Sequence, residues 1–167
     1  MSTSPVVLLA SLAAIASAAA AGMMYVFSTF VMRGLDRTGP ATAITAMRAI
    51  NADANGNAPF LLAYFGAALL AVAVGVVAVI QFRQPGSGWL LAGAILGVLG
   101  ALLTIAFNVP LNDHLDTVDP ATRAVADTAR EWQAYLSTWR AWNHARTATA
   151  IVAPVLMLVG ARYRCLG

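Results

Sequence analysis

Four long runs without a charged side chain follow one another along this chain of 167 residues. A helix needs roughly 18 to 20 apolar residues to cross the hydrocarbon layer of a bilayer, and the first three runs reach that length. The last run is uncharged only between Arg146 and Arg162, so its helix must include more polar residues to cross. Only 10% of the residues are charged and 60% are hydrophobic, which excludes a soluble globular domain and a disordered chain. We therefore predict an all-α fold, a four-helix transmembrane bundle.

The predicted bundle is a single transmembrane domain over residues 1–167. Its four spans are expected near residues 8–32, 58–82, 88–108 and 139–162. Because consecutive spans run antiparallel, the two longer connections meet at one membrane face, here called the loop face, and both termini lie at the terminal face. Both connections contain helical patterns, which predict helices that cap the loop face. The last helix is expected to begin outside the bilayer near Ala121, because Asp119-Pro120 is a favourable start for a helix.

The distribution of charge favours an orientation with both termini in the cytoplasm of a bacterium, within its plasma membrane. Three unpaired arginines, Arg83, Arg162 and Arg164, lie at the terminal face, whereas the loop face carries seven Arg and seven acidic residues. A count of Arg alone favours the opposite orientation. The net charge of +3 rests on few residues and does not indicate a surface for nucleic acid.

Polar residues gather at the loop face, where they border the spans or enter the last one. They include Asn51, Asn108, Asn112, Trp139, Trp142, Asn143, His144 and Arg146. Trp139, Asn143 and Arg146 follow the spacing i, i+4, i+7 and share one face of a helix. An arginine inside a bilayer is unfavourable unless it meets a partner or water, so it marks a site by default. We expect Arg146 to point into the bundle, towards Asn108 and Asn112.

Structural roles for these residues remain open alternatives. Tryptophan at a membrane boundary is commonly an interfacial anchor. Arg146 could extend to the membrane surface or pair with an acid of a loop, and Asn108 and Asn112 could cap the third span. The chain lacks a phosphate-binding loop, paired cysteines and the motifs of zinc or serine hydrolases, and its single cysteine cannot form an internal disulfide.

Four short segments carry a resemblance to a known family. They are Met47-Arg-Ala-Ile-Asn51, Pro59-Phe60, Asn108-Val-Pro-Leu-Asn112 and Trp139-Arg-Ala-Trp-Asn-His-Ala-Arg146. In this order, within a protein of four spans, they resemble the family of small membrane proteins called DUF1772, or the anthrone oxygenase family. The resemblance extends from about Gly22 to Ala161. It implies oxidation of a lipophilic aromatic compound, anthrone- or quinol-like, by O2.

The resemblance also implies roles for individual residues. Candidate catalytic residues are Arg146, Asn143, Asn108, Asn112 and His144. Candidate substrate-binding residues are Trp139, Trp142, Asn51, Phe60 and Tyr25. Arg146 would stabilise an oxyanion, the asparagines would donate hydrogen bonds, and His144 is the nearby side chain that would act as a base.

The expected partners are the aromatic compound, O2 and membrane lipid, and small residues of the first span also favour a homo-oligomer. No metal ligands and no cofactor are predicted, although the sequence leaves haem, flavin and copper open. The competing hypothesis is a non-enzymatic membrane subunit that binds a lipid or a partner protein through the same polar face.

Overall fold

The computed structural model describes residues 4–166, and this part of the chain forms helices and turns without a strand. In chain order the elements are α1 (Pro5–Val26), η1 (Phe27–Val31), α2 (Met32–Asp36), α3 (Pro40–Gly56), α4 (Ala58–Ile80), α5 (Ser87–Leu103), η2 (Thr104–Asn108), α6 (Val109–Asp116) and α7 (Val125–Leu166). The elements η1 and η2 are single π-helical turns within longer helical stretches.

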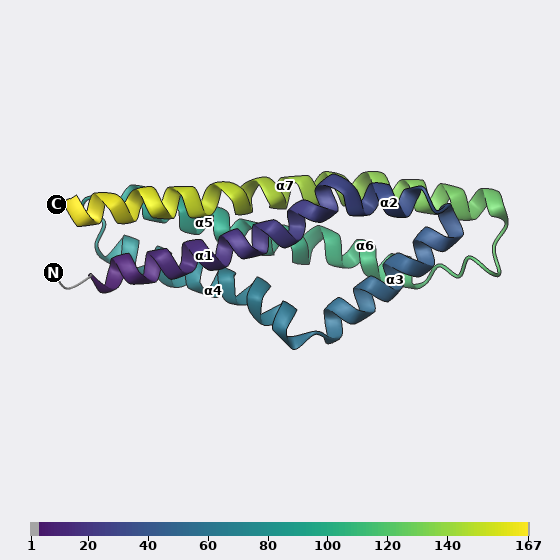
Figure 1. The fold of residues 1–167 in the computed structure, drawn as a ribbon, viewed down its shortest axis with the longest axis horizontal. Coiled ribbons are helices and arrows are strands. Elements are labelled where there is room, and N and C mark those ends of the chain that lie inside the picture. The colour runs from purple at the N-terminus through teal and green to yellow at the C-terminus, as the bar shows by residue number, and fades with distance from the viewer. Residues whose placement is uncertain (1–3, 167) are drawn as a thin grey trace.

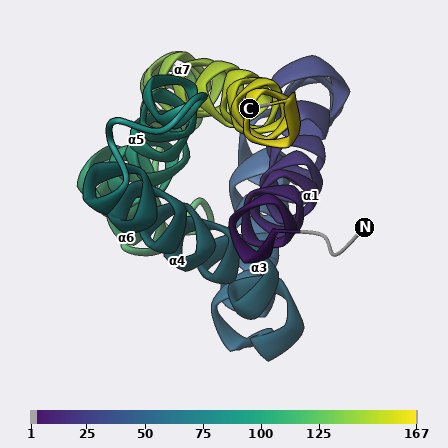
Figure 2. The same ribbon diagram turned by 90° about the vertical axis from the view of Figure 1, so that its left-hand side faces the viewer.

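Four of these helical stretches are long and apolar enough to cross a membrane. They are Pro5–Asp36, Ala58–Ile80, Ser87–Asp116 and Val125–Leu166. The predicted four-helix transmembrane fold is therefore confirmed, and the chain has the build of an integral membrane protein. Figure 1 shows α7 extending along the whole molecule, with both described chain ends at the same side. Figure 2 shows α1, α4, α5 and α7 arranged around a common axis.

The first and third spans continue past the ends expected for them, and each does so through a π-helical turn. In the third span, Pro110 lies two residues after η2, at the second position of α6. A proline lacks a backbone N–H and crowds the carbonyl one turn before it. The extra residue of a π-helical turn relieves that conflict, so the helical stretch continues through Pro110 to Asp116.

The loop face has its own hydrophobic core, formed where the two longer connections meet at this face. Helix α3 lies against the loop-side half of α7 and diverges from α4 at a sharp corner (Figure 1). Met47 of α3, Leu115 of α6 and Trp132 of α7 are buried in one cluster. The cap that the sequence predicts over this face is therefore helical and packed.

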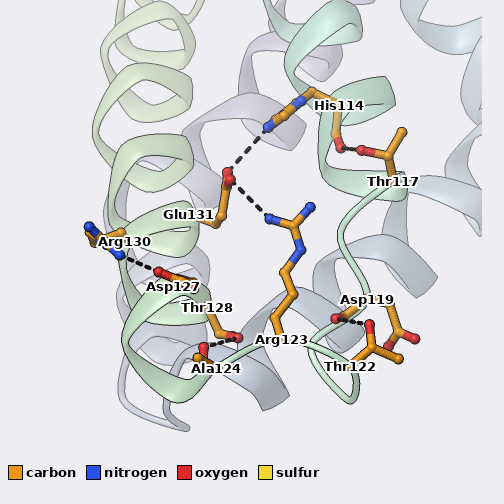
Figure 3. Close-up of polar contacts among 10 residues, drawn as sticks. All are labelled: His114, Thr117, Asp119, Thr122, Arg123, Ala124, Asp127, Thr128, Arg130 and Glu131. Carbon is orange, nitrogen blue, oxygen red and sulfur yellow. Dashed lines mark hydrogen bonds and ion pairs between the residues drawn. The ribbon is translucent and has the colours of Figure 1, made fainter.

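Helix α7 begins at Val125, a few residues later than expected. The Asp119 side chain accepts a hydrogen bond from the Ala121 N–H at 3.0 Å, so Asp119-Pro120 forms a local turn instead of the first turn of the helix. Figure 3 shows how this end is held: Glu131 lies 3.2 Å from His114 Nε2 and accepts a hydrogen bond from Arg123. These exposed contacts link α6, the turn and α7.

Within the bundle, glycine permits the close approach of α5 and α7. A Cβ atom placed on Gly93 would lie 2.9 Å from the Ala153 carbonyl oxygen, and one on Gly160 would lie 2.7 Å from the Leu90 side chain. At the terminal face Arg164 donates hydrogen bonds to Gln81 and Ser87. The two helices are therefore closely packed at these glycines, and a cavity lined partly by polar residues lies towards the loop face.

Candidate functional site

Arg146 lies inside the protein, with only 6% of its surface exposed. Its Nε donates a hydrogen bond to Asn143 Oδ1 at 2.9 Å, and its Nη1 donates one to Thr104 Oγ1 at 3.0 Å. The guanidinium carbon lies 5.2 Å from the centre of the Trp139 ring, a cation–π distance. Among residues 4–166, none of the ion pairs involves Arg146. A buried positive charge is thus held by neutral groups alone.

The partners of Arg146 differ from the expected ones, since Thr104 and Asn143 take the place of Asn108 and Asn112. The reason is the antiparallel course of α7 and the third span. Asn108 Nδ2 donates to the Trp139 carbonyl oxygen at 3.3 Å, which sets Asn108 level with Trp139. Arg146 lies seven residues deeper on α7, and so it meets a residue that lies deeper on the third span.

Asn143 joins α7 to the first span. This fully buried side chain donates hydrogen bonds to the Met24 carbonyl oxygen at 3.0 Å and to Ser28 Oγ at 2.6 Å. The Ser28 hydroxyl also contacts Thr147 Oγ1 at 3.2 Å. Asn143 therefore uses its amide nitrogen to hold the first span and its oxygen to orient Arg146.

Asn112 fixes the aromatic wall of the site. Its Oδ1 accepts hydrogen bonds from the Tyr135 hydroxyl and from Trp139 Nε1, both at 2.9 Å. The Phe27 ring lies 5.7 Å from the Trp139 ring, measured between centroids. Asn108 and Asn112 thus determine the position of Trp139, and Trp139 in turn lies beneath Arg146.

These side chains border a cavity of about 120 Å³ on the loop-face side of the bundle, here called the loop-face cavity. It is lined by Met24, Phe27, Met47, Ile50, Asn51, Ala54, Asn55, Phe60, Leu61, Tyr64, Phe65, Thr104, Val109, Asn112, Trp139 and Arg146. Most of these residues are apolar or aromatic, and a few are strong hydrogen-bond donors. Such a surface is typical of a site for a small molecule with an apolar body and few polar atoms.

Three candidate residues lie away from this cavity. Tyr25 is 52% exposed on the outer surface of the bundle. His144 is exposed as well, because it follows Asn143 directly and a helix turns successive side chains about 100° apart. Trp142 stacks on Phe107 with their ring centroids 3.6 Å apart, and neither ring lines the cavity.

Five candidates line the cavity, and two support it from behind. Asn51, Phe60, Asn112, Trp139 and Arg146 contribute to its walls. Asn143 and Asn108 are buried behind the walls and make hydrogen bonds to other elements.

Sequence reasoning missed Tyr64 and Thr104, which complete the deep end of the cavity. The Tyr64 hydroxyl makes a short hydrogen bond with Thr104 Oγ1, and it also lies 3.3 Å from the Gly100 carbonyl oxygen. The ring of Tyr64 stacks on that of Phe60. The sequence does contain a signal for both residues, because each hydroxyl lies within a run of residues that is otherwise almost wholly apolar.

In the described part of the chain, no three His, Cys, Asp or Glu side chains gather as a metal site would require. The groups that the cavity offers are therefore a guanidinium, amides, hydroxyls and aromatic rings.

A family model described as anthrone oxygenase matches residues 60–156. This segment includes Thr104, Trp139 and Arg146, and it spans α4 to α7. Neither the curated proteins nor the solved structures include a match to this chain. The matched segment covers more than half of the sequence, and the chain belongs to the anthrone oxygenase family.

Proposed function

We propose that this protein is a membrane oxygenase that binds a lipophilic aromatic compound, anthrone- or quinol-like, in the loop-face cavity and oxidises it with O2. The observation that carries the proposal is the buried guanidinium of Arg146, which borders an aromatic cavity without an acidic partner among the described residues. A buried charge without a counterion is unfavourable, so a ligand that brings a negative charge binds well there.

The role proposed for Arg146 is to stabilise the ionised form of the substrate. Loss of a proton from the CH₂ group of an anthrone, or from a quinol hydroxyl, leaves negative charge on a ring oxygen. A guanidinium beside that oxygen favours the ionised form, and the effect is large where water is excluded. The proton passes to water at the mouth of the cavity, near the exposed residues Asn55 and Val109.

O2 then reacts with the electron-rich ring. With an anthrone, the carbanion transfers one electron to O2, and the two radicals combine to form a C–O bond. Protonation gives a hydroperoxide, which loses water to leave the quinone. One atom of O2 remains in the quinone and the other leaves in water, so the substrate supplies every electron. With a quinol, the ring gives two electrons and two protons to O2, and the products are the quinone and hydrogen peroxide. In both cases the substrate supplies the electrons, so the proposed reaction needs no haem, flavin or copper.

The remaining side chains position the reacting groups. Trp139 and Phe60 provide apolar walls against which a flat ring can stack. Thr104 and Asn143 are positioning residues, because they hold the guanidinium and lie further from the ligand. His144 is exposed on the outside and has no part in this scheme.

The test is O2 consumption by the purified protein in lipid nanodiscs, with anthrone and with 1,4-hydroquinone. Empty nanodiscs give the rate of spontaneous oxidation. The expected result is a rate above this background with at least one of the two substrates, and Arg146→Leu should abolish that rate. Arg146→Lys should restore little of it, because an ammonium cannot reproduce the planar set of donors. Arg162→Leu, which changes an exposed arginine of the same helix, should leave the rate unchanged.

Two outcomes would contradict the proposal. One is a rate equal to the background with every aromatic substrate. The other is full activity in Arg146→Leu. If the wild-type protein binds aromatic compounds without consuming O2, the alternative of a non-enzymatic membrane subunit gains support.

A further inference from the structure

We propose that the loop-face cavity accepts a single aromatic ring with oxygen atoms on opposite sides, one bound by Arg146 and the other by Asn51. This inference rests on the site of the proposed function and narrows its substrate class to quinol-type rings. The first argument is size. The cavity has a volume of about 120 Å³, which is similar to the cavity of about 150 Å³ that holds one benzene molecule. Pockets that enclose larger ligands have volumes of about 300 to 1,000 Å³.

The second argument is an unused donor at Asn51. Only 5% of this residue is exposed, and it lines the cavity. Its Nδ2 makes no hydrogen bond of normal geometry among residues 4–166, and the nearby Tyr135 hydroxyl donates to Asn112 instead. A buried donor without a partner is rare in proteins, since burial removes its hydrogen bonds to water. An oxygen atom of a bound ligand would satisfy this donor.

The third argument is a donor at the other end of the cavity. Arg146 uses Nε for Asn143 and Nη1 for Thr104, and neither bond uses Nη2. Its guanidinium borders the same cavity as Asn51. The cavity therefore presents one cationic donor and one neutral donor, which suits a ligand with one ionisable hydroxyl and one further oxygen.

The fold separates these two donors. Met47 precedes Asn51 by one helical turn and packs in the same cluster as Tyr135 and Trp139, so Asn51 lies at the loop-side end. Arg146 follows Trp139 by seven residues, about 10 Å along α7, and binds Thr104 at the deep end. The Trp139 ring lines the same cavity, with the guanidinium carbon 5.2 Å from its centre, and it offers a stacking surface for one ring.

A three-ring anthrone fits this arrangement poorly. Its reacting carbon belongs to the central ring, whereas the cavity has room for one ring beside Arg146. A quinol places both oxygens on the ring that enters. A chain or second ring attached to it can extend through the mouth, beside the exposed residues Asn55 and Val109.

The experiment measures binding under argon, so that it does not depend on O2 consumption. The probes are 4-methoxyphenol and 4-ethylphenol, which have similar size and differ in the oxygen opposite the hydroxyl. Isothermal titration of the protein in nanodiscs should show that 4-methoxyphenol binds about 3- to 10-fold more tightly, the contribution of one hydrogen bond. Asn51→Leu should remove this preference. Thr45→Leu, at an exposed position of α3 outside the cavity lining, should retain it.

A third titration tests size, and anthrone should fail to displace bound 4-methoxyphenol. Equal affinity of the two phenols for the wild-type protein would overturn the inference, as would a preference that persists in Asn51→Leu or displacement by anthrone. If Asn51→Leu aggregates, Asn51→Ala replaces it. A preference without O2 consumption would refute the proposed function alone. O2 consumption without any preference would refute this inference alone.

Discussion

Arg146 Nη1 donates a hydrogen bond to Thr104 Oγ1 at 3.0 Å, and this contact joins the last span to the π-helical turn of the third. Thr104 Oγ1 also donates to the Gly100 carbonyl oxygen and contacts the Tyr64 hydroxyl. One hydroxyl thus links three spans at the depth of the buried charge. The position of the guanidinium therefore depends on a residue that has no charge.

Replacing Thr104 by valine should test this link, because valine has the same shape without the hydroxyl. We expect a loss of stability of about 1 to 3 kcal/mol, since both Arg146 and Tyr64 lose a buried partner. The measurement is the midpoint of thermal unfolding in detergent. Thr138→Val, at an exposed position of α7, should shift the midpoint by less than the error. Equal midpoints for the two variants would contradict the role of Thr104.

Asn143→Asp should separate stability from binding. A carboxylate at this position would pair with the Arg146 guanidinium, whose Nε lies 2.9 Å from the present Oδ1. The pair would neutralise the charge that the ligand is proposed to meet. We expect a folded protein with at least a tenfold weaker affinity for phenols, measured by titration. Both Asn143→Asp and Asn143→Leu remove the amide donor to Ser28 and to the Met24 carbonyl oxygen, so both should lose stability, but only Asn143→Asp supplies a counterion to Arg146. Wild-type affinity in Asn143→Asp would contradict this account.

The shared acceptor at Asn112 predicts that two substitutions are not additive. Tyr135→Phe and Trp139→Phe each remove one hydrogen bond to Asn112 Oδ1. Each should cost about 0.5 to 1.5 kcal/mol from the bond itself, and Trp139→Phe should cost more because its ring is larger. The double variant leaves the acceptor without either donor, so its loss should exceed the sum of the two. The measurement is the free energy of unfolding of the wild type, the two single variants and the double variant, which together form a double-mutant cycle. A loss in the double variant equal to the sum of the two single losses would refute the coupling.

Much of the fold follows from the length of apolar runs, which is a property of the sequence alone. Four spans, their alternation and the burial of Arg146 are predictable because a bilayer admits few arrangements of backbone and charge. The π-helical turns are less predictable. They depend on how the helix accommodates Pro110 and on the neighbouring spans, and these are tertiary effects.

The candidate site shows the same division. Trp139, Asn143 and Arg146 share a helix face, so their periodicity predicts that they lie together. The partner at Thr104 depends on the vertical register of two antiparallel helices, which periodicity does not specify. His144 fails to reach the cavity because one step along a helix turns a side chain to another face, and adjacency in sequence conceals this.

Gly93 supplies a last prediction, about the packing of α5 against α7. A Cβ atom at this position would lie 2.9 Å from the Ala153 carbonyl oxygen and equally close to the Met157 side chain. Because a backbone atom cannot move aside without moving its helix, Gly93→Ala should push the helices apart and reduce stability by about 1 to 3 kcal/mol. Gly66→Ala is the matched control, since a Cβ atom there meets nothing within 4 Å. It should raise stability by about 0.5 to 1 kcal/mol, through the lower entropy of the unfolded chain. Thermal unfolding of both variants should therefore give shifts of opposite sign, and a stabilised Gly93→Ala protein would show that α5 and α7 are less tightly packed than described.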